Sequence, residues 1–89
     1  DRAIMDAIEV GVPLFNGGDA RGCGEVYSAA LKRLLEQKTL IAGTWSHRLA
    51  TAAISRAAQQ DPVAGAWTLR RAMDSILRCL ALAGERGGQ

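Results

Sequence analysis

The feature that most constrains this chain is the spacing of its apolar residues, which recur at steps of three and four. The clearest stripe consists of Cys23, Val26, Tyr27, Ala30, Leu31, Leu34 and Leu35. Such steps place side chains on one face of an α-helix, whereas a half-buried strand requires alternation. No stretch of strand length alternates. The sequence therefore predicts an all-α protein.

Glycine, proline and aspartate divide the chain into four amphipathic segments, which predict helices over about residues 2–16, 19–36, 46–60 and 61–84. Asp19 and Asp61 stand where a capping carboxylate accepts hydrogen bonds from the free amides of a first turn. Pro62 follows at the first helical position, where its missing amide proton costs nothing. Gly18 is expected to end the first helix and Gly84 the fourth.

The chain has 89 residues, 48% of them hydrophobic and 22% charged, which is enough for one small folded domain. We expect a compact four-helix domain over residues 1–84, built from two antiparallel helical hairpins. Residues 85–89 are expected to form a flexible tail.

Some residues predict unusual packing within these helices. Pro13 lies inside the first segment, where it is expected to kink or loosen the last turn. Gly22 and Gly24 are poor helix formers, and their position beside Cys23 suggests that another backbone passes close to this turn. The third segment is rich in alanine, so we expect it to pack tightly against a neighbouring helix.

A motif surrounds the predicted turn at Gly18-Asp19, in the order Val10, Gly11, Leu14, Phe15, Gly18, Asp19, Cys23, Tyr27, Ala30 and Leu31. Over about residues 7–34 this order resembles the helix-turn-helix unit of the tetratricopeptide repeat. The resemblance implies that Gly11 and Cys23 are the small residues where two helices cross, and that Tyr27 is the bulky aromatic that follows. The motif is also similar to a helical domain of uncharacterised bacterial and algal proteins. The second half of the chain shows no further copy, which favours one compact domain over a repeat array.

Charge and hydropathy exclude some partners. The net charge is only +2, the basic residues are spread along the chain, and the chain has just four aromatic residues. A nucleic-acid-binding surface would need a concentrated basic patch with stacking residues, so no nucleic-acid partner is predicted. The longest charge-free stretches have nine residues, fewer than the roughly 18 of a membrane-spanning helix. Peripheral attachment to a membrane complex stays open.

The residues capable of chemistry are few. Cys23 and Cys79 match no zinc motif; they are expected to be buried free thiols or, alternatively, one bridge between the second helix and the last. His47 is the single histidine and has no base or ligand partner in the sequence. We therefore predict neither enzymatic activity nor a metal or cofactor. A small thiol-dependent enzyme or redox carrier is an alternative.

The sequence favours a non-catalytic docking, linker or accessory subunit that binds a larger protein assembly. Its predicted contact residues are exposed charges and two tryptophans: Arg21, Glu25, Lys32, Arg33, Trp45, Trp67, Arg70, Arg71, Asp74 and Arg78. A tetratricopeptide-like module that binds an extended peptide is a second hypothesis. The start at Asp1 is compatible with a removed leader, as in a subunit of an organelle's photosynthetic or respiratory complex, or with a fragment of a longer product.

Overall fold

The computed structural model describes residues 2–38, 40 and 42–87, and side chains among them as far as residue 81. It contains four helices, α1 (Arg2–Asn16), α2 (Ala20–Glu36), α3 (Trp45–Ala57) and α4 (Pro62–Gly87). The described residues include no strand. The prediction of an all-α, four-helix domain is therefore confirmed.

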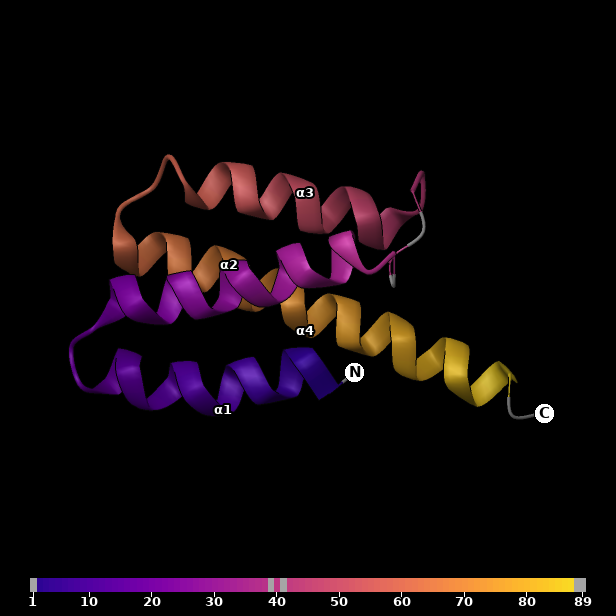
Figure 1. Cartoon of the computed structure of the whole chain (residues 1–89), viewed down its shortest axis with the longest axis horizontal. Helices are drawn as coiled ribbons and strands as arrows, with labels where there is room; N and C mark the ends of the chain where they lie inside the picture. Colours follow the sequence, from indigo (N-terminus) through magenta and orange to yellow (C-terminus); the bar gives the residue numbers. More distant parts are fainter. Residues whose placement is uncertain (1, 39, 41, 88–89) are drawn as a thin grey trace.

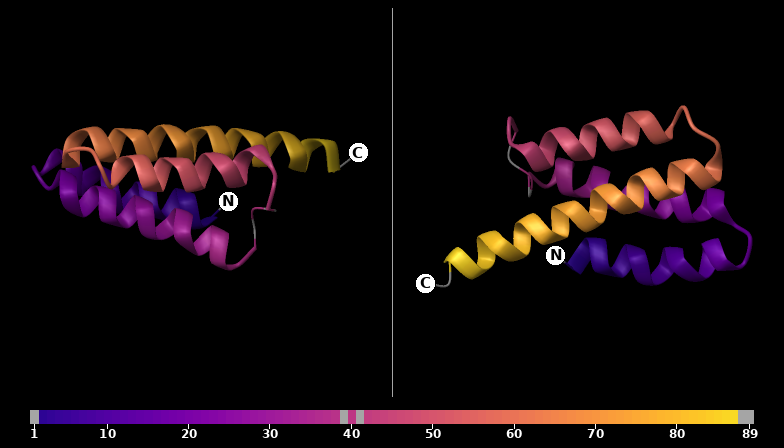
Figure 2. Two further views of the ribbon diagram at one scale, coloured as in Figure 1. Left: turned by 90° about the horizontal axis from the view of Figure 1, so that it is seen from above. Right: turned by 180° about the vertical axis from the view of Figure 1, so that it is seen from behind.

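The helices form two antiparallel hairpins, α1 with α2 and α3 with α4 (Figure 1). Helix α4 crosses behind α2 in this view and makes the main contact between the hairpins, while α1 and α4 touch only slightly. The C-terminal part of α4 projects past the other helices, as the view from behind shows (Figure 2). This projection lengthens the molecule to 43 × 23 × 18 Å.

Helices α2 and α4 begin at the predicted capping residues. The Asp19 carboxylate accepts a hydrogen bond from the Gly22 amide at 2.9 Å, and the Asp61 carboxylate accepts one from Ala64, also at 2.9 Å. Gly18 adopts a left-handed conformation with φ of 93° between α1 and α2, which glycine tolerates because it has no Cβ. The sequence thus places both capping aspartates correctly.

Two predicted boundaries are wrong. Helix α3 covers Trp45–Ala57 rather than residues 46–60, because residues 58–60 form turn hydrogen bonds that reverse the chain before Asp61. Helix α4 runs to Gly87 rather than ending at Gly84, since glycine weakens a helix without forbidding it. Residues 85–87 of the predicted tail are therefore helical, and residues 88–89 lie outside the described part of the chain.

The glycines at the start of α2 admit no neighbouring backbone, contrary to the prediction. A Cβ on Gly22 would lie 2.8 Å from Cγ of Asp19, so the space beside it holds the capping carboxylate. Nothing lies within 4 Å of a Cβ on Gly24. The close approach of two helices occurs at Gly65 of α4, where a Cβ would lie 3.1 Å from the Ala57 carbonyl oxygen of α3.

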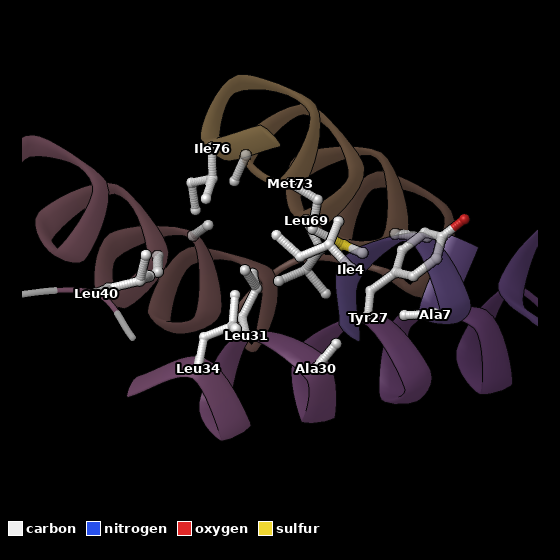
Figure 3. Packing of buried hydrophobic residues seen from close by; sticks show 14 of the residues in the cluster. Ile4, Ala7, Tyr27, Ala30, Leu31, Leu34, Leu40, Leu69, Met73 and Ile76 are labelled. Carbon is white, nitrogen blue, oxygen red and sulfur yellow. The ribbon is translucent and has the colours of Figure 1, made fainter. Parts of the chain in front are cut away.

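The core lies where α4 crosses the first hairpin (Figure 3). Its largest fully buried side chains come from three helices: Ile4 of α1, Cys23, Leu31 and Leu34 of α2, and Met73 and Ile76 of α4. Helix α3 adds only Ala50 and Ala53 to the buried set. As predicted, this alanine-rich helix packs closely, but it contributes little apolar area.

The first hairpin closes where Tyr27 of α2 packs against Gly11 of α1. A Cβ on Gly11 would lie 2.8 Å from Cζ of Tyr27, so the aromatic ring occupies the space that any other side chain would need. Tyr27 is only 3% exposed. Pro13 does not end α1, which continues to Asn16.

This contact predicts opposite effects for two glycine substitutions. Gly11→Ala forces the Tyr27 ring to move and is expected to lower the free energy of unfolding by about 1–3 kcal/mol. Gly24→Ala is the matched control, because its methyl group meets no neighbour and removes the entropic cost of glycine in a helix. It should raise the free energy of unfolding by about 0.5–1 kcal/mol in urea denaturation. Equal effects of the two substitutions would contradict the packing described for Tyr27.

Candidate functional site

A pocket of about 200 Å³ opens between α1, α2 and α4. It is lined by Val12, Phe15, Asn16, Cys23, Tyr27, Ala66, Trp67 and Arg70. Three of the four aromatic residues of the chain are in this set. The pocket forms because the C-terminal end of α1 and the N-terminal end of α4 lie at the same end of the bundle (Figure 1).

The rim of the pocket is an aromatic pair. Phe15 of α1 and Trp67 of α4 meet edge to face, with ring centroids 5.7 Å apart and an interplanar angle of 73°. Trp67 is nevertheless 49% exposed. Val63, one helical turn before Trp67, is also half exposed, so it extends the apolar rim along α4.

Polar side chains also line the pocket, among them Tyr27 and Arg70. The Tyr27 hydroxyl lies close to the Arg70 guanidinium and the Cys23 thiol, and both affect its ionisation. Arg70 also donates from Nε to Oδ1 of Asp74 at 3.2 Å. The side chains of Tyr27, Arg70 and Asp74 therefore form a series of neighbours that runs from the buried tyrosine to the exposed face of α4.

The ionisation of Tyr27 and Arg70 follows from these contacts. Burial raises the pKa of Tyr27 above its ordinary value of 10.0, the Cys23 thiol raises it further, and the Arg70 guanidinium opposes both. Burial lowers the pKa of Arg70, but hydrogen bonds to Asp74 and Tyr27 outweigh this effect and raise that pKa. At neutral pH the pocket therefore presents a neutral phenol and a permanent cation.

The structure distributes the predicted contact residues over several surfaces. Trp67 and Arg70 line the aromatic pocket, and Asp74 binds Arg70. Three other grooves hold most of the remaining residues. Arg21, Glu25 and Lys32 line the groove between α2, α3 and α4, and Lys32 with Arg33 lines the groove between α1 and α2. Trp45 and Arg71 line the groove between α3 and α4, and Arg78 is exposed on α4. The two tryptophans therefore do not share a site.

Phe15 and Tyr27 line this pocket, although neither was predicted as a contact residue. Tyr27 was expected to fill the gap between α1 and α2, and it does contact Gly11, but its hydroxyl also reaches Arg70 of α4. One sequence feature could have indicated that these two residues lie close together: Phe15 precedes and Tyr27 follows the same turn. Their convergence with Trp67 depends on how α4 crosses the hairpin.

Both cysteines are free. Cys23 is buried at 1% exposure in the wall of the pocket, as expected for a core thiol, whereas Cys79 of α4 is only partly buried. The alternative of a bridge between α2 and α4 is wrong. Within the described residues, no three His, Cys, Asp or Glu side chains gather where they could hold a metal ion.

None of the described helices combines the length and apolarity that crossing a membrane requires. No protein family, curated protein or solved structure matches this chain.

The buried position of Tyr27 predicts a measurable titration, because it is the single tyrosine in the chain. Phenolate absorbance should report a midpoint above 10.0 in the folded protein. Replacing Arg70 by methionine removes the opposing cation and should raise that midpoint further. Since the folded state holds the phenol proton more tightly than the unfolded state, this stabilisation is complete below pH 10.0 and is lost as pH rises through the folded-state pKa. A midpoint at or below 10.0 would contradict the burial argument.

The exposure of the two thiols predicts their reactivity. A maleimide reagent should label Cys79 in the folded protein and label Cys23 only after unfolding, because a 1% exposed thiol is inaccessible. Intact mass should show one label per chain under native conditions and two in denaturant. Cys79→Ser is the control and should abolish native labelling. Two labels without denaturant would show that the pocket wall opens.

Proposed function

We propose that this protein is a binding module that docks onto a protein partner and receives an apolar side chain of that partner in the aromatic pocket. The convergence of Phe15, Tyr27 and Trp67 at one site supports this proposal most directly. Tryptophan and tyrosine, together with arginine, are enriched among residues that contribute most to protein–protein binding. All three types are present here.

The exposure of Trp67 gives the physical reason. About half of this large side chain faces solvent, next to a half-exposed Val63. Covering such apolar surface is favourable at roughly 25 cal/mol per Å². A tryptophan side chain loses little conformational entropy when it is covered, because it has only two rotatable bonds. A partner that seats a side chain beside Trp67 would gain from both effects.

The pocket also favours a partner's side chain over a free small molecule. Its volume of about 200 Å³ lies below the roughly 300–1,000 Å³ typical of small-molecule sites. In this proposal the protein acts as a non-catalytic docking or accessory subunit of a larger assembly. The organelle complex proposed from the sequence would be one such assembly.

A tetratricopeptide-like module that binds an extended peptide is the second candidate. It rests on the resemblance of residues 7–34 to a tetratricopeptide unit, which implies Gly11 beside Cys23 and Tyr27 in the gap between the two helices. Tyr27 does pack between α1 and α2, but the atoms nearest to a Cβ on Gly11 belong to Tyr27 rather than to Cys23. The two candidates differ in the form of the ligand. A peptide module binds a short linear segment in isolation, whereas a docking subunit needs the folded surface of its partner.

The proposal is tested by capture with the immobilised protein from extracts of the cells that produce it, followed by mass spectrometry and affinity measurement with the purified partner. Trp67→Ala should weaken that complex by about tenfold or more. Met5→Ala is the matched control, because Met5 is 55% exposed and lies outside the pocket. It should leave the affinity unchanged. A partner held equally by wild type and Trp67→Ala would refute a docking role for this pocket.

A further inference from the structure

The groove between α3 and α4 has a volume of about 360 Å³, and the two helices lie side by side (Figure 2, left). On α3 it is lined at helical spacing by Trp45, Leu49, Ala52, Ala53 and Arg56. The α4 side contributes Thr68, Arg71, Ala72 and Ser75. Both walls are thus straight stripes of one helix face, with small side chains along the floor and large ones at the edges.

The length of this groove suits an α-helix. From Trp45 to Arg56 the α3 wall covers eleven residue steps, or about 16 Å, which is three helical turns. Alanines on the floor allow a third helix to approach closely, because they leave no bulky side chains between the backbones. Trp45 is 50% exposed at one end of the groove, where it offers an anchor for an apolar side chain.

The charges around the groove have one sign. Arg56 of α3 and Arg71 of α4 both line it, and neither forms an ion pair within the described residues. Helix α3 contains no acidic residue. Residues 45–87, which contain α3 and α4, carry six Lys or Arg and three Asp or Glu, whereas residues 2–36 carry four Lys or Arg and five Asp or Glu. The excess positive charge of the chain therefore resides in the α3/α4 hairpin.

We propose that the groove between α3 and α4 binds an acidic amphipathic helix of a partner protein. The apolar side of that helix lies on Trp45, Leu49 and Ala52, which are exposed or partly exposed along the groove. Its carboxylates lie at the edges of the groove, where Arg56 and Arg71 are positioned to pair with them. This is the helix-in-groove mode of recognition, in which residues spaced by three and four supply the anchors. Charge complementarity sets the orientation and speeds association.

The apolar floor argues against a nucleic acid as the occupant. A phosphate backbone is bound by cationic and polar side chains and gains nothing from an alanine-lined floor. A helix with one apolar face uses both the floor and the two arginines. The proposal does not depend on the aromatic pocket, because Trp67 and Arg70 line that pocket on one side of α4 while Arg71 and Ala72 line the groove on the other.

The test uses synthetic peptides of about 14 residues, which form roughly four helical turns. One peptide carries leucines at steps of three and four with glutamates beside them, and the second has the same composition in an order that gives no apolar face. A third replaces each glutamate of the first with lysine. Fluorescence anisotropy of labelled peptides measures the affinities for the full chain. A single-stranded DNA oligonucleotide serves as the anionic competitor.

Wild type should bind the amphipathic glutamate peptide about tenfold or more tightly than the scrambled or lysine peptides. Arg56→Glu with Arg71→Glu should reverse the preference in favour of the lysine peptide. Both arginines are exposed, so circular dichroism should show an unchanged fold. Arg33→Glu, on the outer face of α2, is the matched control and should keep the wild-type preference.

Three results would overturn the proposal: no binding of the amphipathic peptide, equal binding of the scrambled peptide, or displacement of the peptide by the oligonucleotide at equal charge concentration. Trp67→Ala separates this proposal from the one on the aromatic pocket. It should leave the peptide affinity within about twofold while weakening the complex with the captured partner. Loss of peptide binding in Trp67→Ala would contradict an independent groove.

Discussion

The contact between Tyr27 and Gly11 determines how the rest of the molecule is arranged. Because Gly11 has no side chain, the Tyr27 ring lies against the backbone of α1 and closes the first hairpin. The same ring directs its hydroxyl toward Arg70 of α4. A single buried phenol thus connects three helices. The aromatic pocket is the space left beside it.

The small size of the core explains why the surface keeps open features. Ile4, Leu31, Leu34, Met73 and Ile76 fill the crossing of α4 with the first hairpin, and α3 is attached to α4 through alanines and the close approach at Gly65. Alanines bring helices together but do not fill the grooves on either side of them. The aromatic pocket and the α3/α4 groove lie on either side of α4, and they are the two surfaces at which we propose that a partner binds.

Much of the fold could be predicted because the signals are local. The stripe from Cys23 to Leu35 predicts α2, and the capping carboxylates of Asp19 and Asp61 predict where α2 and α4 begin. The predictions were wrong where a tertiary contact or a competing turn outweighed a local sequence preference. Gly22 accommodates its own capping carboxylate rather than another backbone, and α3 ends at Ala57 because the chain must turn before Asp61. The candidate site was predicted only in Trp67 and Arg70.

The sequence by itself determined the number of helices, the capping aspartates of α2 and α4 and the buried helix faces, because periodicity and capping act over a few residues of the chain. Only the tertiary structure decided that Phe15, Tyr27 and Trp67 meet at one end of the bundle and that Trp45 belongs to a different groove. Those residues are far apart in sequence. The crossing of α4 over α2 brings Phe15, Tyr27 and Trp67 together and leaves Trp45 in another groove. This crossing depends on packing between helices.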